Sequence, residues 1–147
     1  NDSKTEILVI TQPHNTKMAN ELKIKIGSCT ASPSKIAKNL GVTFDSNLNM
    51  EKQIANTCQS VMLQLRNIGN IRKFLSDTAT AQVIHSLVTS RLDYCNSVLY
   101  GLPDCKLQKL QRMQNIAARI LTGTPRSSHI TPVLYQLHWL PIKARVL

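Results

Sequence analysis

In the stretch Asp45–Ile68, DSNLNMEKQIANTCQSVMLQLRNI, the hydrophobic pattern changes from a period of two to a helical period, which predicts a long helix after a β segment. Asp45, Ser46 and Asn47 are candidate N-caps, and Glu51 stands in an early helical turn. Apolar residues then recur at steps of four, three, four and three, which predicts one buried stripe. The stripe consists of Ile54, Cys58, Val61, Leu65 and Ile68.

Two more helices are expected downstream of Gly69, which should weaken or end the first one. Ser76 is a good N-cap for a helix from Asp77 that stops near the YCNS cluster. A third helix runs from about Asp104 to Leu121 and is closed by Gly123 and Pro125. The stripe of the second helix is Val83, Ile84, Leu87, Val88 and Leu92; that of the third is Leu107, Leu110, Met113, Ala117 and Ile120.

The segment before Asp45 alternates and is rich in β-branched residues. TEILVIT from Thr5 and ELKIKIG from Glu21 indicate strands, and KNLGVTFD from Lys38 fits a third. Turn residues in QPHNTKMAN and SCTASPS predict loops between them. The expected fold class is therefore α+β: a small antiparallel β segment, residues 1–46, followed by a mainly α-helical bundle, residues 47–147.

The composition favours a polyanionic partner or an acidic surface. Lys+Arg number 18 against 8 Asp+Glu, which gives a net charge of +10. Most of the excess follows Asp45, with twelve basic and four acidic residues. Four scattered cysteines form no C-x-x-C pair and no apolar run is long enough to span a bilayer, so we expect an intracellular protein, nuclear or cytoplasmic, that is neither secreted nor membrane-bound. Because the chain starts at Asn1, we interpret it as a piece of a longer protein.

Basic residues recur on the expected helices opposite the apolar stripes. Lys52, Arg66 and Lys73 are spaced by multiples of seven, and Lys109, Arg112 and Arg119 share a face of the third helix. Such faces can follow a phosphate backbone. An ordinary solvated face remains the alternative, although few acids stand beside these residues.

Catalytic and metal-binding patterns are missing from the sequence. The four histidines have no metal-ligand spacing, the aspartates fall in separate elements, and no glycine-rich phosphate loop occurs. Trp139 is interpreted as a core residue rather than a base-stacking one. SRLDYCN, Ser90–Asn96, is interpreted as a structural corner, because Cys95 has no activating neighbour beyond Arg91.

Six segments, in order, resemble one family. They are KTEILVI from Lys4, KNLGVTFDSNLNMEKQI from Lys38, LRNIGNIRKFLS from Leu65, SRLDYCNSVLYGLP from Ser90, LQRMQNIAARILT from Leu110 and HITPVLYQLHWLPIKAR from His129. Together they cover nearly the whole chain. They resemble the reverse transcriptases of LINE-type (non-LTR) retrotransposons, in the portion after the catalytic aspartates.

The resemblance implies that residues 1–46 are the C-terminal edge of a polymerase palm and that residues 47–147 are the thumb and the connection behind it, truncated at the end. It implies a nucleotide-proximal role for Lys4 and a primer-gripping hairpin at Leu40, Gly41 and Val42. Lys52, Arg66, Lys73, Lys109, Arg112 and Arg119 become candidate nucleic-acid-binding residues.

The implied function is that of a palm and thumb fragment of an RNA-directed DNA polymerase, which grips the template-primer duplex through backbone contacts. Its partners would be this RNA/DNA duplex and the upstream palm and fingers. Mg²⁺ is implied for the parent enzyme, but not for this chain, which lacks the catalytic aspartates and should be inactive alone. The alternatives are a non-catalytic helical interaction module and a degenerate retrotransposon-derived protein.

Overall fold

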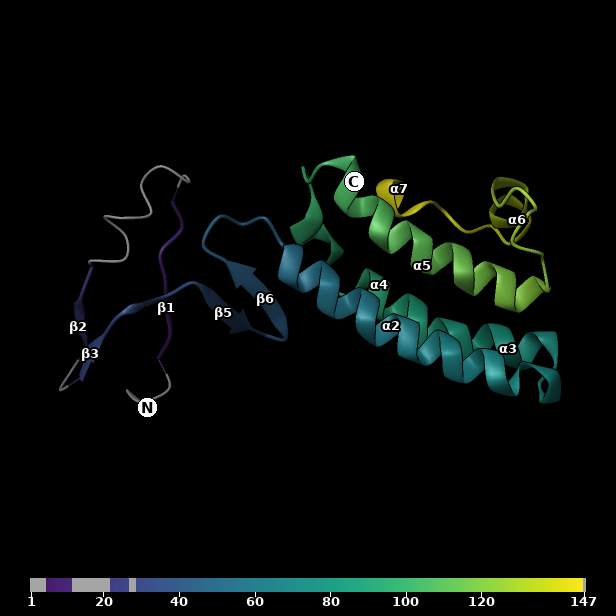
Figure 1. The fold of residues 1–147 in the computed structure, drawn as a ribbon, viewed down its shortest axis with the longest axis horizontal. Helices are drawn as coiled ribbons and strands as arrows, with labels where there is room; N and C mark the ends of the chain where they lie inside the picture. The colour runs from purple at the N-terminus through teal and green to yellow at the C-terminus, as the bar shows by residue number, and fades with distance from the viewer. Residues whose placement is uncertain (1–4, 12–21, 27–28, 147) are drawn as a thin grey trace. The chain divides into compact units, whose positions relative to one another are not determined.

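The structure, a computed structural model, describes residues 5–11, 22–26 and 29–146 (Figure 1). Contacts divide the chain into two compact units, Asn1–Gln53 and Ile54–Leu147. Short strands fill the first unit and helices fill the second, so the predicted α+β class is confirmed. The division falls just inside the first long helix rather than at the predicted change of pattern.

The first unit contains short paired strands. Their bounds are β1 (Ile7–Leu8), β2 (Ile24–Ile26), β3 (Cys29–Ala31), β4 (Pro33–Ser34), β5 (Ile36–Asn39) and β6 (Val42–Asp45). β2 pairs with β3 and β5 with β6, both antiparallel, whereas β1 and β4 form a two-residue parallel pair. The predicted turn at residues 12–20 lies outside the described residues.

The predicted loop SCTASPS is wrong for most of its length, because β3 and β4 lie within it. Thr30 pairs with Lys25 of β2, and Pro33 pairs with Ile7 of β1. The turn signal of Pro and Ser is local, whereas pairing depends on a partner strand that is distant in sequence. Backbone pairing therefore overrides the local preference here.

A tight hairpin forms over KNLGVTFD, where the residue pattern predicted a single strand and the resemblance implied a hairpin at Leu40, Gly41 and Val42. Asn39 of β5 pairs directly with Val42 of β6, so Leu40 and Gly41 are the whole connection. Both have positive φ, 46° and 83°, which is the type I′ arrangement that fits the twist of antiparallel strands. Gly41 adopts this conformation readily, whereas Leu40 is strained in it.

Asp45 organises the passage from β6 to the first helix. Its carboxylate accepts hydrogen bonds from the backbone N–H groups of Asn47 (3.2 Å), Asn49 (2.9 Å) and Met50 (2.7 Å). The helix itself begins at Glu51, so Asp45 stabilises the preceding loop rather than serving as the helix N-cap. Gln53 adds a link to β6 by accepting a hydrogen bond from the Thr43 N–H at 2.9 Å.

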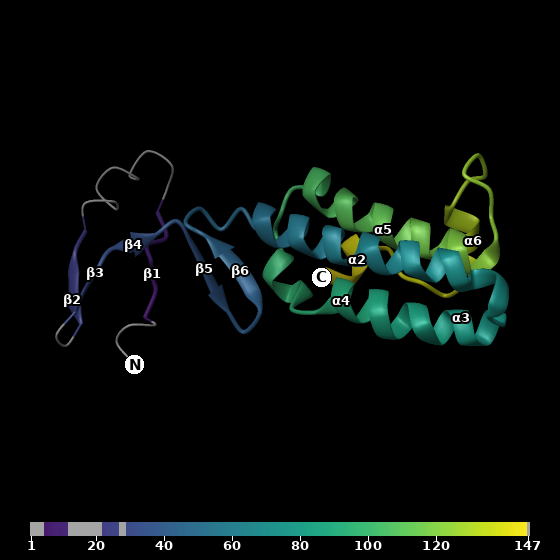
Figure 2. The same cartoon turned by 60° about the horizontal axis from the view of Figure 1, so that its bottom comes forward.

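The second unit is built from helices. Their bounds are α2 (Glu51–Ile71), η3 (Arg72–Phe74), α3 (Asp77–Ile84), η4 (His85–Thr89), α4 (Ser90–Asp93), η5 (Asn96–Leu99), α5 (Asp104–Thr122), α6 (Thr131–Gln136) and α7 (Ile142–Val146). α2 and α5 run in the same direction, and the continuous rod of α3, η4 and α4 runs back beside them (Figures 1 and 2). α6 and α7 pack against α5.

Most residues of the predicted stripes form the core of this bundle, but Leu87 is 36 % exposed, and Val83 and Ile120 are only partly buried. Four of the five predicted residues of α2 are buried, and Cys58 is half-buried. Buried core side chains of the other helices include Ile84, Val88, Leu92, Leu107, Leu110, Met113, Ala117 and Ala118. Ser76 caps α3 by accepting a hydrogen bond from the Ala79 N–H at 3.2 Å, and Gly123 ends α5 with a φ of 69°, as predicted.

Two features of the helices differ from the expectation. α2 does not end at Gly69 but continues to Ile71, because Ile68 is buried in the core and its packing offsets the roughly 1 kcal/mol cost of a helical glycine. The second helix is not uniform, since His85–Thr89 is wound as a π-helix. Such stretches insert a residue into a turn and leave no periodicity that a sequence pattern reveals.

Arg72 joins the end of α2 to the end of α5. Its guanidinium donates hydrogen bonds to the carbonyl oxygens of Ile120, Leu121 and Leu75, each at 3.0 Å, and forms an ion pair with Asp77. The last carbonyls of a helix have no partner within it, and cations are favoured there. Arg72 thus satisfies the C-terminus of α5 from another element.

Two glutamines hold the C-terminal segment on α5. The buried Gln114 donates from Nε2 to the Leu140 carbonyl at 2.9 Å, and Gln111 Oε1 accepts from the Ile142 N–H at 2.8 Å. Gln111 Nε2 also donates to Gln114 Oε1 at 2.8 Å. Because buried amides are costly without partners, this network fixes the connection between α6 and α7.

Candidate nucleic-acid interface

The first basic row follows the exposed side of α2. Lys52 and Arg66 are both exposed on this helix, as their spacing predicts. Lys73 lies just beyond α2, in the 3-10 turn η3, with its ammonium 4.9 Å from the centre of the Phe74 ring. Lys52 and Arg66 are fourteen residues apart, which corresponds to about 21 Å of helix axis.

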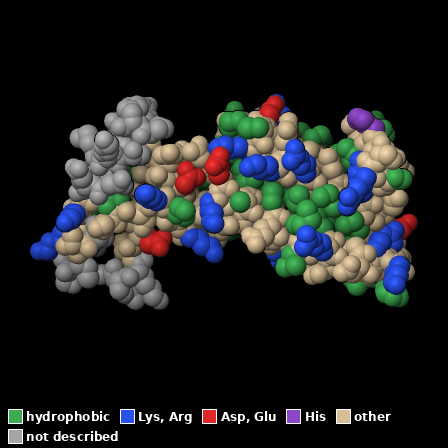
Figure 3. All heavy atoms as spheres, in the orientation of Figure 1, with side chains coloured by type: hydrophobic (Ala, Val, Ile, Leu, Met, Phe, Trp, Pro, Cys, Tyr) green, Lys and Arg blue, Asp and Glu red, His purple; other side chains and the backbone are tan. Residues whose placement is uncertain are grey.

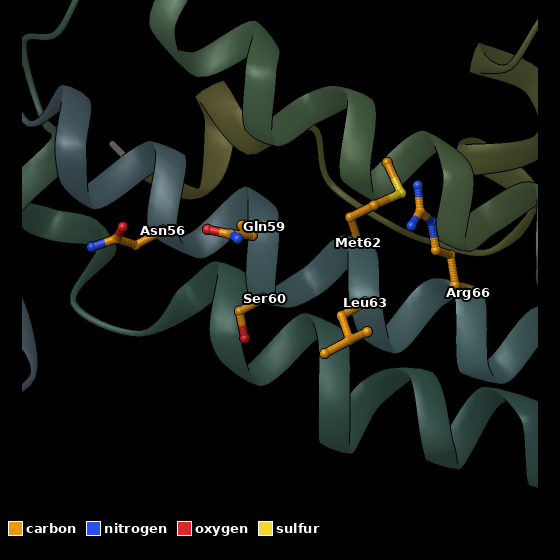
Figure 4. Close-up of a pocket in the computed structure, with 6 residues that line it drawn as sticks. All are labelled: Asn56, Gln59, Ser60, Met62, Leu63 and Arg66. Carbon is orange, nitrogen blue, oxygen red and sulfur yellow. The ribbon is translucent and has the colours of Figure 1, made fainter.

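An open hollow of about 670 Å³ lies along the same side of α2. Its lining residues are Asn56, Gln59, Ser60, Met62, Leu63 and Arg66. Figure 4 shows Met62 and Arg66 extending towards α5. Ser60 and Leu63 point towards the rod of α3, η4 and α4, which runs antiparallel to α2. Leu63 is 57 % exposed, so this side of α2 carries an apolar patch between its basic residues.

The second basic row belongs to α5, but its three members differ. Lys109 and Arg112 are exposed neighbours one turn apart. Arg119 is half-buried, and its guanidinium donates hydrogen bonds to the carbonyls of Pro125 and Ser128, the latter at 2.9 Å. Arg119 therefore stabilises the loop after α5, and fewer of its donors are free for a ligand.

The charge of Lys109 reaches α2. Burial raises the pKa of the half-buried Cys58 thiol of α2, and the ammonium of Lys109 partly opposes this rise. α2 and α5 run next to each other (Figures 1 and 2), and Arg66 of α2 extends towards α5 (Figure 4). We call the exposed cations of these two helices the α2–α5 face: Lys52, Arg66, Lys109 and Arg112.

The α2–α5 face is positive without compensation. Within the part of the chain that the structure describes, none of its four cations forms an ion pair. Figure 3 shows Lys and Arg side chains across the helices in this view, whereas the acidic side chains visible there lie near the helix ends. Cations left unpaired beside one another are favourable for a polyanion and mutually repulsive without one.

Sequence reasoning missed two contributors to this surface. Arg91 of α4 donates a hydrogen bond to Ser60, a residue of the hollow, and so brings another guanidinium to α2. Leu63 interrupts the polar side of α2, and this departure from the amphipathic pattern is the signal that could have been noticed. Arg91 had no comparable signal, because its position depends on how the helices pack.

The remaining predicted site residues lie in the first unit. Leu40 is 82 % exposed at the hairpin tip beside the exposed Gly41, whereas Val42 is buried. Only the first two could touch a ligand directly. Lys4, the predicted nucleotide-proximal lysine, lies outside the described residues.

The aspartates of the helical unit are engaged in holding the fold. Asp77 pairs with Arg72, Asp104 with Lys143 at 2.9 Å, and Asp93 with Arg145. No group of three His, Cys, Asp or Glu that could hold a metal ion occurs within residues 5–11, 22–26 and 29–146. These three carboxylates therefore serve as partners of basic residues within the helical unit.

The SRLDYCN segment is a corner, as predicted. Asp93 holds Arg145 of α7, and Asn96 Nδ2 donates to the Arg145 carbonyl at 2.9 Å. Cys95 turns the chain between α4 and η5 with a φ of 52°. The exposed Tyr94 has its pKa raised, first by the charge of Cys95 and then by a hydrogen bond with it. These contacts tie the corner to the end of the chain.

The fold and the face define an α+β protein whose helical unit presents uncompensated cations. Comparison with protein-family models, curated proteins and solved structures gives no match. In the described part of the chain, no helix is both long enough and apolar enough to cross a bilayer.

Proposed function

We propose that the chain is the palm edge and thumb of a LINE-type reverse transcriptase, and that its α2–α5 face holds the template-primer duplex by phosphate contacts. The observation that carries the proposal is the set of exposed cations without ion pairs on two parallel helices. The order of the six segments that resemble LINE-type reverse transcriptases supports the choice of this family.

The dimensions of the face suit a duplex. Lys52 and Arg66 are about 21 Å apart along α2, roughly the axial length of six base pairs. Lys109 and Arg112 offer a second row beside them. Two rows of cations that follow the backbone would fix the position of a duplex without reading its sequence.

In this proposal the chain contributes binding and orientation. Leu40 and Gly41, at the hairpin tip, would contact the primer end, and the α2–α5 face would hold the duplex through its phosphates. Catalytic aspartates of an upstream palm would hold the Mg²⁺ ions that supply the phosphoryl-transfer chemistry. The chain alone would therefore bind a duplex without extending it.

The test is the salt dependence of binding to a short RNA/DNA hybrid. Arg66→Ala or Arg112→Ala should each weaken binding about fivefold at low salt and reduce the slope of log K against log salt by about one unit, because each removes one phosphate contact. Fluorescence anisotropy at several salt concentrations, on duplexes of unrelated sequence, measures both quantities.

Lys143→Ala is the matched control, because it removes the same charge from a residue already paired with Asp104. It should leave the slope nearly unchanged. Equal effects of all three substitutions would mean that only net charge matters, and unchanged binding in both arginine variants would overturn the proposed face.

A helical interaction module is the second candidate. Leu63 is exposed and lines the α2 hollow, an arrangement that also suits a protein partner. Leu63→Ser distinguishes the two functions, because it should leave the salt slope of duplex binding intact while removing an apolar anchor for a protein.

A further inference from the structure

A second hollow, whose lining includes none of the four cations of the α2–α5 face, gathers polar side chains from three parts of the helical unit. It has a volume of about 300 Å³ and is lined by His85, Thr89, His138, Trp139, Leu140 and Arg145. His85 and Thr89 are the first and last residues of the π-helix η4, the next three precede α7, and Arg145 belongs to α7. This size lies at the small end of ligand pockets.

Two irregular backbone conformations meet at this hollow. The π-helix places His85 and Thr89 at its wall, and His138 has a φ of 55°, in the left-handed region that costs a side chain about 1 kcal/mol or more. Strained or irregular backbone persists where the surrounding structure holds it, and it concentrates at binding sites. Here the network of Gln111 and Gln114 holds the segment that contains His138.

The lining offers donors for an anion. The partly buried Arg145 uses one nitrogen, Nη2, for Asp93, which leaves other N–H groups of its planar fork available. Two imidazoles and the Thr89 hydroxyl add further donors. Among the described residues, no Asp or Glu lines the hollow, and Asp93 pairs with the guanidinium of Arg145 and orients it.

Trp139 stands against His85. Their ring centres are 5.6 Å apart, and the planes meet at 69° in an edge-to-face arrangement. The indole thereby fixes one imidazole of the hollow and provides an apolar wall. We propose that this hollow binds the terminal phosphate of a small phosphate monoester, with His85, His138 and Arg145 as its donors.

A phosphate monoester fits better than a singly charged anion. It carries about −1.5 to −2 charges at neutral pH and three acceptor oxygens, which match the donors of one guanidinium and two imidazoles. The charge of Arg145 is already balanced by Asp93, so binding depends on both histidines as well. This inference is independent of the duplex-binding proposal.

The experiment follows the emission of Trp139, which is the chain's only tryptophan and lines the hollow. Inorganic phosphate, ribose 5-phosphate and ribose are titrated into the full chain. Both phosphate-bearing probes should give a saturating change, whereas ribose should give none. Equal affinity for the two identifies free phosphate as sufficient, and tighter binding of ribose 5-phosphate identifies a sugar phosphate.

His138→Asn and His85→Gln should each weaken binding of ribose 5-phosphate roughly tenfold, the effect of losing a charge-assisted hydrogen bond. Asn tolerates the left-handed φ of His138, so that variant should keep its fold by circular dichroism. His129→Asn is the matched control, since His129 is exposed and lies outside the hollow.

The proposal is overturned if neither phosphate probe alters Trp139 emission, or if the control loses binding as much as the two hollow variants do. Arg112→Ala should leave ribose 5-phosphate binding intact, and His138→Asn should leave duplex binding intact. These crossed results separate a failure of this site from a failure of the α2–α5 face.

Discussion

The arginines of the helical unit divide by what their guanidinium groups donate to. Arg72, Arg119 and Arg145 are bound to carbonyls or carboxylates of the fold. Arg66 and Arg112 are exposed and form no ion pair within the described residues. Heptad spacing places Arg112 and Arg119 on one face, but only tertiary packing decides that Arg119 is used to hold a loop.

Cys58 provides a test of the α2–α5 face at the scale of one residue. Burial raises its pKa and Lys109 opposes the rise, so Lys109→Met should raise the pKa further. A higher pKa means less thiolate at mildly alkaline pH, and alkylation by iodoacetamide should therefore slow in the folded variant. Mass spectrometry measures the rate in a chain whose other cysteines are serine.

The difference should vanish in urea, where Lys109 no longer lies beside the thiol, and also at a pH high enough to ionise Cys58 fully. Arg126→Met, an exposed substitution in the loop after α5, should not alter the rate. An unchanged rate in the Lys109 variant would place its ammonium away from α2 and divide the proposed face.

At the scale of elements, the long helices follow directly from the sequence. Their apolar stripes, the Ser76 cap and the Gly123 end are local signals that the packing reinforces. The sequence carries no such local signal for strands β3 and β4 or for the π-helical stretch. Their formation depends on partners elsewhere in the chain, which explains why the basic rows could be predicted and the hollow at His138 could not.

The β5–β6 hairpin carries a prediction of its own. Leu40 adopts a φ of 46° that Asn tolerates far better, so Leu40→Asn should stabilise the hairpin by about 0.5–1 kcal/mol. Slower amide hydrogen exchange in β5 and β6 measures the gain. Gly41→Ala should do the opposite, because Gly41 has a φ of 83°.

If Leu40→Asn accelerates exchange instead, the two-residue turn is not of the I′ type. The same variant bears on the proposed function, because a more stable hairpin that binds a primer duplex less well would show that the leucine side chain itself contacts the primer end.

At the scale of the whole molecule, apolar side chains remain exposed in the first unit. Leu22 and Ile24 are 42 % and 38 % exposed, although the alternation of ELKIKIG predicts that they share one face. A strand whose apolar face is uncovered tends to associate with other chains. In the function that we propose, the rest of the palm would cover this face.

The double substitution Leu22→Thr and Ile24→Thr should therefore reduce concentration-dependent association of the chain, as measured by light scattering, while keeping β-propensity. Leu87→Thr, a change at an apolar residue that is similarly exposed in the helical unit, is the control. Equal association of all three proteins would argue that this face needs no palm to cover it.

The hydrogen bonds of Arg72 also bear on how the protein is made. Arg72 donates hydrogen bonds to the carbonyl oxygens of Ile120 and Leu121, which follow it by nearly fifty positions in the sequence. During synthesis α2 and α3 leave the ribosome well before the last turn of α5. Their apolar stripes therefore remain exposed until α5 is complete. A chain that ends before residue 121 would therefore leave these apolar side chains exposed and would need a chaperone to prevent aggregation.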